Sequence, residues 1–357
     1  MTSHSTKHNL HFIIGIGRSG TTILSKSLNK YSEIHCLPEA NFLLFFLCHF
    51  KNKTNFSAND IEDIFKQISI YSKSHPWAGW EFNAEQARVA ILKKMSASND
   101  MTYPEICKVI YTQFKVIGID KSNAKILLDK NPSYTIFSNK ISKTSPESKF
   151  IWIIRDYRSN ILSRKQNLVL KHPPDIAYNA IRWKLYNKDA NAFHKEKSDK
   201  VILIKYEDLI SNNFEVSNKL NEFLEINSNM LETDFEEKLK VNTTNFDIPN
   251  EYTERFSKKY TDLNKTLNTE RLDAWKEQLS ANEIKICEAI CSNFGKEMGY
   301  NSFINISKFE KIKIIVHHLP SIIKGYIDVY KDKILYYAPI KIKLNRLKKK
   351  YIELKLI

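Results

Sequence analysis

The residues best suited to chemistry stand near the start of the chain, in the stretch GIGRSGTTIL at residues 15–24. Glycines that connect a buried strand to a helix bring backbone N–H groups and the positive end of the helix close to an anion. The stretch therefore predicts a binding site for a phosphate or a similar group. Residues outside the glycine pattern must decide which anion that is.

One interpretation of this stretch is a dinucleotide site. Its three glycines match the G-x-G-x-x-G spacing, and Glu39 lies 19 residues after Gly20, near the expected place of the acid that binds ribose. Arg18 and the threonines after Gly20 argue against this interpretation, because a dinucleotide loop has no use for them.

A second interpretation is the triphosphate loop of a kinase-like enzyme. Such a loop ends in Gly-Lys-Ser/Thr, where the lysine reaches the β and γ phosphates and the hydroxyl holds magnesium. Here Gly20 is followed by Thr21, while Asp129, at the end of an apolar run, is a candidate for the metal-holding acid. The missing lysine counts against this interpretation.

A second motif lies in the stretch FIWIIRDYRSNILSRKQ, residues 150–166. Arg155 stands at the end of a predicted strand, and Ser163 follows eight residues later in the next predicted helix. A guanidinium and a hydroxyl placed in this way can converge on one dianionic phosphate. The alternative is an ordinary surface arginine and an ordinary helical serine.

Together the two motifs resemble sulfotransferases that use 3′-phosphoadenosine 5′-phosphosulfate (PAPS). The resemblance is to the branch with Arg-Ser-Gly-Thr-Thr, which includes tyrosylprotein and bacterial carbohydrate sulfotransferases, and it covers about residues 10–300. It implies that Arg155 and Ser163 grip the 3′-phosphate. It also implies that the 5′-phosphosulfate is held by Gly17, Arg18, Ser19, Gly20, Thr21 and Thr22.

The same resemblance implies three catalytic residues. Glu39, 21 residues after Arg18, is the base that takes the acceptor proton, and Lys130 in LLDKNPSY lies beside the transferring group. Arg18 and Lys130 then stabilise the leaving phosphate and the sulfuryl oxygens, and no metal is required. The alternatives are a structural acid near the first turn of the helix after Pro38 and a solvated loop lysine.

Two further side chains are interpreted less specifically. Tyr206 in IKYEDL is expected to line the nucleotide pocket, although a buried tyrosine at a strand end needs no ligand to explain it. Arg158 either assists at the 3′-phosphate or is a surface charge. Tyr157 replaces a proline that is common in the family at this position and can equally begin a helix.

The elements that must position these residues alternate along the chain. Apolar runs bounded by polar residues, separated by helical patterns, predict an α/β fold with a P-loop-like parallel sheet, helices on both faces, and ligands at the carboxyl ends of the strands. We expect a helical insert at about 51–120 and a long irregular segment or lid at 227–268. We expect strands over 11–16, 34–37, 124–130, 149–156 and 200–208, and helices over 20–30, 40–50, 60–71, 83–95, 104–117, 174–197, 270–278 and 281–298.

Charge divides the chain into a domain at 1–300 and a basic amphipathic extension at 301–357. The whole chain carries +15, and the extension alone has twelve lysines and one arginine against four acidic residues. Lysines alternating with apolar residues suit an anionic membrane surface or an acidic glycan. The alternative is an amphipathic helix that packs on the domain or on a partner. Without a module signature, we expect no nucleic acid partner.

The remaining composition bears on the compartment. The five cysteines lack the spacing of a disulfide framework, and Cys287 and Cys291 are expected to be core residues rather than metal ligands. We see no secretion signal and no apolar run near the roughly 20 residues that span a bilayer. The protein is therefore expected to be cytoplasmic, either soluble or peripheral to the membrane.

The sequence thus predicts a PAPS-dependent sulfotransferase that modifies a hydroxyl, most readily on a carbohydrate or a glycolipid. Protein tyrosine sulfation is the first alternative. A P-loop kinase-like enzyme and a non-catalytic nucleotide-binding module also remain open, and the module would have no need of Glu39 or Lys130.

Overall fold

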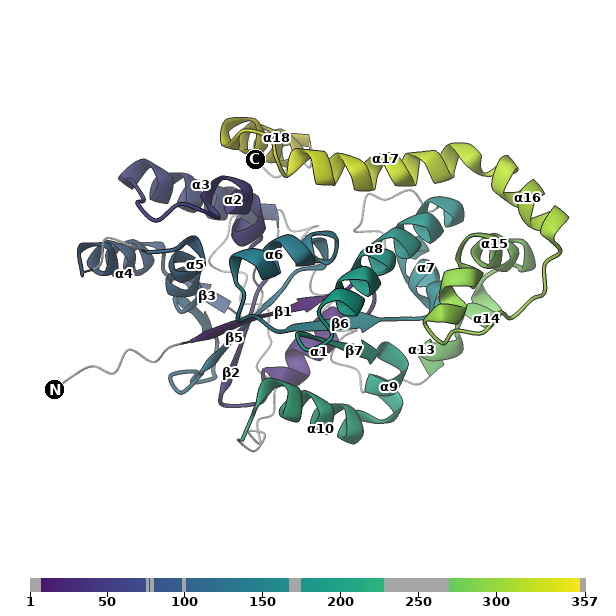
Figure 1. Ribbon diagram of the computed structural model, residues 1–357, viewed down its shortest axis with the longest axis horizontal. Helices are drawn as coiled ribbons and strands as arrows, with labels where there is room; N and C mark the ends of the chain where they lie inside the picture. The colour runs from purple at the N-terminus through teal and green to yellow at the C-terminus, as the bar shows by residue number, and fades with distance from the viewer. Residues whose placement is uncertain are drawn as a thin grey trace.

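A five-stranded, fully parallel sheet forms the centre of the protein (Figure 1). The computed structural model describes residues 8–74, 77, 80–97, 101–166, 175–227 and 270–353. The strands lie in the order β2-β5-β1-β6-β7, which confirms the predicted α/β class. Their bounds are β1 (Asn9–Ile14), β2 (Ile34–Leu37), β5 (Ile126–Lys130), β6 (Phe150–Ile154) and β7 (Val201–Lys205).

Both faces of the sheet are buried because consecutive residues of its strands are apolar, and consecutive side chains point to opposite faces. Phe12 and Ile14 of β1 pack into one core, whereas Ile13 between them packs into the other. In β6, Trp152 and Ile153 divide between the same two cores. A parallel sheet covered on both faces is expected to show such continuous apolar runs.

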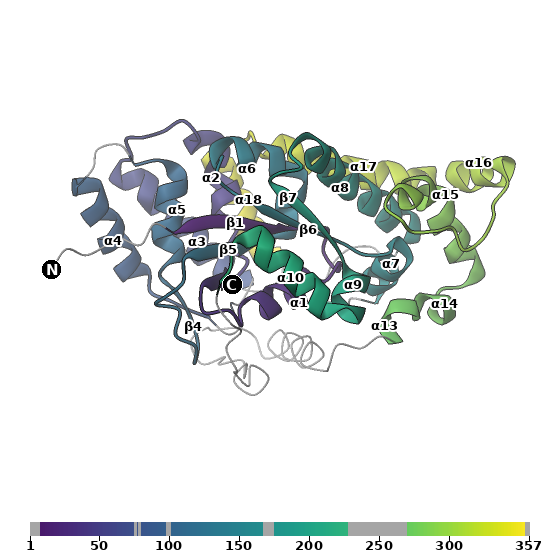
Figure 2. The same cartoon turned by 60° about the horizontal axis from the view of Figure 1, so that its bottom comes forward.

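Helices cover the sheet in two layers, as the tilted view shows (Figure 2). One layer consists of α1 (Thr21–Leu28), α9 (Tyr206–Ser211) and α10 (Asn213–Leu224). The other includes η1 (Pro132–Phe137), α6 (Ser138–Thr144), α7 (Tyr157–Lys165) and α8 (Ile176–Glu196). The predicted helices on both faces are therefore confirmed.

The predicted helical insert contains a small sheet that the sequence interpretation missed. Between α2 (Phe42–Phe50) and the sheet strand β5 lie α3 (Ala58–Ser74), β3 (Trp80–Phe82), α4 (Ala84–Ala97), α5 (Tyr103–Tyr111) and β4 (Phe114–Val116). The helix predicted to reach residue 117 is wrong beyond Tyr111, because β4 pairs with β3 in antiparallel fashion. Apolar residues alternate there, and Phe114 stacks on Phe82 with ring centroids 4.4 Å apart.

The C-terminal part of the chain is helical. It comprises α13 (Glu270–Asp273), α14 (Trp275–Gln278), α15 (Ala281–Glu297), α16 (Lys308–His317), α17 (Leu319–Leu335) and α18 (Ile340–Glu353). Cys287 and Cys291 of α15 are fully buried, as predicted for core residues. The predicted lid at 227–268 lies outside the described residues, apart from residue 227.

Helix α17 packs closely against α8, so the basic extension lies on the domain along one side (Figure 1). Gly325 permits this approach, since a Cβ atom there would lie 2.3 Å from a methyl carbon of Ile181. Nearby, the Tyr178 hydroxyl donates to Asp328 at 2.6 Å. The alternative in which the extension packs on the domain is therefore confirmed for this helix.

A buried carboxylate fixes the end of β5, next to Lys130. Asp129 is completely buried and accepts hydrogen bonds from the hydroxyls of Tyr111 and Tyr134. Burial raises the pKa of Asp129 to about 6. This side chain therefore belongs to the core.

We predict that Asp129→Asn changes how stability depends on pH. The pKa of an unfolded Asp is about 3.9, so the Asp129 contribution is fully present below about pH 4 and is lost as the pH rises through about 6. The variant lacks this loss. Its free energy of unfolding, relative to the wild type, should rise by up to about 3 kcal/mol between pH 4 and pH 7.

Urea unfolding of both proteins at the two pH values measures this change. Any loss of hydrogen bonding lowers the free energy of unfolding of the variant by the same amount at both pH values, so it cancels in the comparison. A stability difference that is the same at both values would contradict the assignment.

Candidate functional site

The glycine-rich loop lies at the carboxyl end of β1, where it passes very close to its neighbours. Gly15 has a φ of 148°, and a Cβ atom there would lie 2.4 Å from the carbonyl oxygen of Ile153. Gly20 has a φ of 99°, and a Cβ atom would lie 2.3 Å from the ring of Tyr206. These two glycines are required because the backbone conformation and the close approach both exclude a side chain.

The loop leads directly into α1 and offers the start of that helix to an anion. Gly20 occupies the N-cap position and provides no side-chain cap. The first N–H groups of a helix have no acceptor within the helix, and the helix dipole places positive charge there. Thr21 is buried and Thr22 is half-buried in this first turn.

Helix α7 holds the loop in place through two side chains that the sequence interpretation missed. The amide of Asn160 donates to the carbonyl of Gly17 at 3.2 Å and to the hydroxyl of Ser19 at 3.1 Å. Arg164 donates to the same Gly17 carbonyl at 3.4 Å. Asn160 and Arg164 lie one helical turn apart, on either side of Ser163 in the sequence. This spacing places them on one face of the helix and could have revealed them from the sequence.

Arg18 and Ser163 meet at this site. Arg18 adopts a φ of 74°, and its Nε donates to the Ser163 hydroxyl at 3.0 Å. The structure thus brings Ser163, 145 positions away in the sequence, to the arginine of the loop. The predicted convergence of Ser163 with Arg155 on one phosphate stays a prediction.

Arg155 extends from the end of β6 over the ring of Tyr206, with its guanidinium carbon 4.4 Å from the ring centroid. Its Nη2 donates to the carbonyl of Arg271 at 2.9 Å, whereas its buried Nε has no partner among the described residues. Tyr206 is itself buried and packs against Gly20 on one side. It therefore supports both the loop and Arg155, and its predicted contact with a nucleotide stays a prediction.

Positive charge gathers here, since Arg18, Arg155 and Arg271 lie close enough to act on one another electrostatically. Burial, followed by the charges of Arg155 and Arg271, lowers the pKa of Arg18, and burial also lowers the pKa of Arg155. Within the described parts of the chain, neither Arg18 nor Arg155 forms an ion pair. A site of this kind fits a ligand that carries several negative charges.

Asp156 directly follows Arg155, and Glu207 lies at the start of α9, just after β7; each of these two carboxylates has a partner of its own. Asp156 pairs with Arg158 at 2.6 Å, and Glu207 accepts a hydrogen bond from Tyr300 at 2.9 Å. Their negative charge partly offsets the burial that lowers the pKa of Arg155, but neither carboxylate forms an ion pair with it.

Glu39 and Lys130 form an ion pair between the end of β5 and the segment after β2. The Lys130 side chain is 9% exposed and that of Glu39 is 31% exposed. The indole of Trp77 donates to the Glu39 carbonyl at 3.1 Å. The alternative of a solvated loop lysine is therefore wrong, since Lys130 is buried beside a carboxylate.

Asp129 and Arg158 do not occupy the places that two other interpretations gave them. Asp129, the candidate metal-holding acid, is bound to two core tyrosines. Arg158 is neither a surface charge nor directed to a ligand, because it is buried, pairs with Asp156 and Glu288, and lies 4.2 Å above the ring of Trp275. Both side chains stabilise the core instead.

Comparison with known proteins gives a family. A family model described as "Sulfotransferase family" matches residues 11–229, which is more than half of the chain. No curated protein sequence matches significantly.

Solved structures of bacterial sulfotransferase domains are similar to this chain. A sulfotransferase domain from the curacin biosynthetic pathway shares 18% identity over 83% of this chain and 99% of its own, with a TM-score of 0.46. The sulfotransferase domain of the Synechococcus PCC 7002 olefin synthase shares 17% identity over 80% of this chain and 96% of its own, also with a TM-score of 0.46. A sulfotransferase from Alicyclobacillus acidocaldarius shares 12% identity over 77% of this chain and 98% of its own, with a TM-score of 0.36.

Proposed function

The chain belongs to the sulfotransferase family, and on that premise we propose that it transfers a sulfuryl group from PAPS to the hydroxyl of an acceptor. The family implies transferase activity. The observation that carries the choice of PAPS is a pair of arginines, the half-buried Arg18 and the buried Arg155, beside the start of α1 without an ion-pair partner among the described residues.

The proposed roles of the binding residues follow from their positions. The loop from Gly17 to Thr22 binds the 5′-phosphosulfate through its N–H groups and Arg18. Arg155 and Ser163 bind the 3′-phosphate, which is the group that distinguishes PAPS from ATP. The unpartnered Nε of Arg155 supports this role, because a bound phosphate would supply its missing acceptor.

The proposed catalytic residues are Glu39, Lys130 and Arg18. When bound, PAPS supplies the sulfuryl group to the attacking oxygen and PAP departs. Glu39 takes the proton of the acceptor hydroxyl, a contribution of roughly 10²–10⁴-fold for a positioned base. Lys130 holds the Glu39 carboxylate in place, and Lys130 and Arg18 stabilise negative charge as it develops. This scheme assigns no role to a metal ion.

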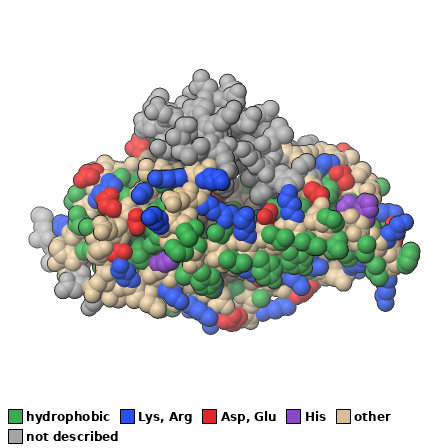
Figure 3. Space-filling model, turned by 90° about the horizontal axis from the view of Figure 1, so that it is seen from above, with side chains coloured by type: hydrophobic (Ala, Val, Ile, Leu, Met, Phe, Trp, Pro, Cys, Tyr) green, Lys and Arg blue, Asp and Glu red, His purple; other side chains and the backbone are tan. Residues whose placement is uncertain are grey.

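The acceptor in this proposal is a hydroxyl of a carbohydrate or a glycolipid, and protein tyrosine is the alternative. Support for a lipid-linked acceptor comes from exposed apolar residues of the extension (Figure 3). Six large apolar side chains of α16 and α17 are more than half exposed and follow helical spacing: Phe309, Ile312, Val316, Ile327, Tyr330 and Ile334. We name these six the apolar stripe.

Charge favours a membrane over a second copy as the partner of the apolar stripe. Lys308, Lys313, Lys324 and Lys331 are exposed on the same two helices. Two copies of such a basic face repel each other, whereas an anionic bilayer attracts the lysines and accepts the apolar side chains. None of the described helices is long and apolar enough to cross a bilayer. We therefore propose peripheral attachment, and the cytoplasmic location stays a prediction.

We predict that Arg155→Ala weakens binding of PAP by about tenfold or more, because a charge-assisted contact with the 3′-phosphate is lost. Calorimetry with PAP and with 5′-AMP measures this loss, and binding of 5′-AMP should change little. Arg88→Ala, on the insert surface, is the control. Equal affinity of the native protein for PAP and 5′-AMP would refute the assignment.

We predict that Glu39→Gln lowers the rate of transfer by roughly 10²–10⁴-fold, because the amide cannot take the acceptor proton. Affinity for PAP should remain, as calorimetry on the same variant checks. Glu222→Gln, at an exposed position on α10, is the control. A Glu39→Gln enzyme with native turnover would remove Glu39 as the base, and a chain with PAP affinity but no transferase activity would favour the binding module.

We predict that the double change Ile327→Asp and Ile334→Asp reduces binding to phosphatidylcholine vesicles containing phosphatidylglycerol by about tenfold or more, because carboxylates are repelled from the anionic surface. Co-sedimentation with the vesicles measures this. Phe214→Asp changes an exposed residue of α10 in the same way and should have little effect. If the double variant pellets as well as the native protein, the apolar stripe is not a membrane contact.

A further inference from the structure

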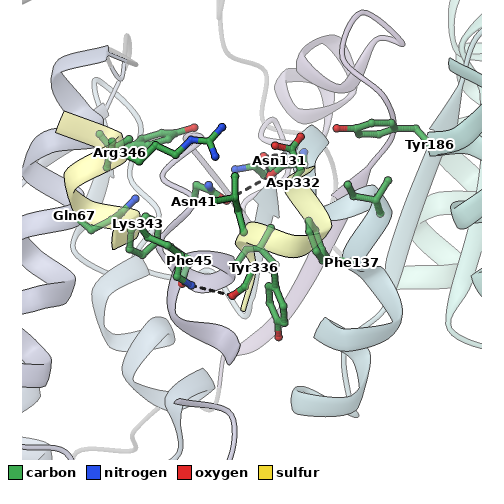
Figure 4. A pocket seen from close by; sticks show the side chains of 16 residues that line it. Asn41, Phe45, Gln67, Asn131, Phe137, Tyr186, Asp332, Tyr336, Lys343 and Arg346 are labelled. Carbon is green, nitrogen blue, oxygen red and sulfur yellow. Dashed lines mark hydrogen bonds between the residues drawn. The ribbon is translucent and has the colours of Figure 1, made fainter. Parts of the chain in front are cut away.

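A cavity of about 350 Å³ lies between the sulfotransferase core and the C-terminal extension (Figure 4). Its walls come from α2, α3, the segment after β5, α8, and the helices α17 and α18. The volume falls in the range of pockets that bind small ligands. We name it the extension cavity.

The extension cavity adjoins the Glu39–Lys130 pair. Asn131, which directly follows Lys130, is one of its lining residues. Gln67, also in the lining, donates to the carbonyl of Ala40, the residue after Glu39, at 3.4 Å. A ligand in the cavity therefore touches Asn131 and Gln67, one residue or one hydrogen bond removed from the Glu39–Lys130 pair.

Two buried amides of the lining have polar atoms without partners. Gln67 is completely buried, and its Oε1 accepts no hydrogen bond from the described residues. Asn131 is 3% exposed, and its Nδ2 likewise has no acceptor there, although its Oδ1 accepts from Ser133. Unsatisfied buried groups of this kind are costly and indicate a ligand or solvent that satisfies them. One of these atoms accepts and the other donates, which matches hydroxyl groups, because a hydroxyl does both.

Aromatic rings supply the apolar part of the lining. Phe45, Phe137, Tyr186 and Tyr336 all face the cavity, and Phe137 and Tyr336 stack with centroids 5.2 Å apart. Apolar rings with a few well-placed polar groups are typical of small-molecule sites. A sugar ring offers both surfaces, with C–H faces for the rings and hydroxyls for the amides.

The extension completes this site from outside the family match, which ends at residue 229. It contributes Asp332, Tyr336 and Arg346 to the lining, and in Figure 4 the Arg346 guanidinium points toward the middle of the cavity. Its position is fixed by Lys343, which is buried and donates to the carbonyls of Phe45 and Tyr336. The extension is therefore in a position to select the acceptor.

We propose that the extension cavity binds one sugar residue of a carbohydrate acceptor, with hydroxyls at Gln67 and Asn131 and another hydroxyl facing Glu39. This inference rests on the proposed transferase function. The tyrosine side chain has a single hydroxyl, which must face Glu39, so only the backbone of a peptide could reach the two amides, whereas a sugar ring carries several hydroxyls of its own. The observations therefore favour a sugar over a peptide.

The test uses the full-length protein with PAPS and a panel of p-nitrophenyl glycosides, with a tyrosine-containing peptide as the competing acceptor. Gln67→Met keeps the length of the side chain and removes its amide, while Leu347→Trp adds bulk at the half-exposed rim of the cavity. Each variant should raise the KM for the glycoside by about tenfold, with a smaller effect on kcat and none on PAP affinity. Gln86→Met, at an exposed position on α4, should leave all three unchanged.

Calorimetry of the protein, both with and without PAP, with the same glycosides gives a measure of binding that does not need turnover. The proposal is overturned if the native protein neither binds nor sulfates any glycoside, if it sulfates the peptide instead, or if both variants keep the native KM. Failure of the proposed function is a distinct result, because it appears as loss of PAP binding and of all transfer while glycoside binding at the cavity persists.

Discussion

The structure depends most on two arginines, the half-buried Arg18 and the buried Arg155, that share one edge of the sheet without an ion-pair partner among the described residues. Arg18 leaves the glycine loop in a left-handed conformation, and Arg155 leaves the end of β6. Their mutual repulsion must be balanced by the fold or by a ligand. The loop is held by Asn160 and Arg164, and Arg155 is held by the ring of Tyr206. The described part of the fold thus positions the two charges but gives neither of them a direct ion pair, and Asp156 and Glu207 act on Arg155 only through space.

A second arrangement positions Glu39 and Lys130 separately from the two arginines. Asp129 is fixed in the core by two tyrosine hydroxyls, and this fixes the end of β5 from which Lys130 reaches Glu39. Asp129 therefore serves the core, and the next residue of the strand, Lys130, serves the site. The difference arises from direction, since consecutive residues of a strand point to opposite faces of the sheet.

The C-terminal extension has two different sides. One side packs on α8 through Gly325 and encloses the extension cavity, while the other carries the apolar stripe and its lysines. The proposed sugar site and the proposed membrane contact would together suit an acceptor that is part of a glycolipid. The two proposals rest on separate residues, so either of them can hold without the other.

The sequence by itself determined the parallel α/β sheet and the glycine loop at the end of its first strand, because strand alternation and glycine spacing are local properties of the chain. It did not determine that Arg18 contacts Ser163, that Arg158 is buried with Glu288, or that α5 ends before a small strand. Only the tertiary structure decided these, and it also brought residues of the extension to Asn131. Contacts between residues far apart in the sequence depend on how the layers pack, and no local pattern records that packing.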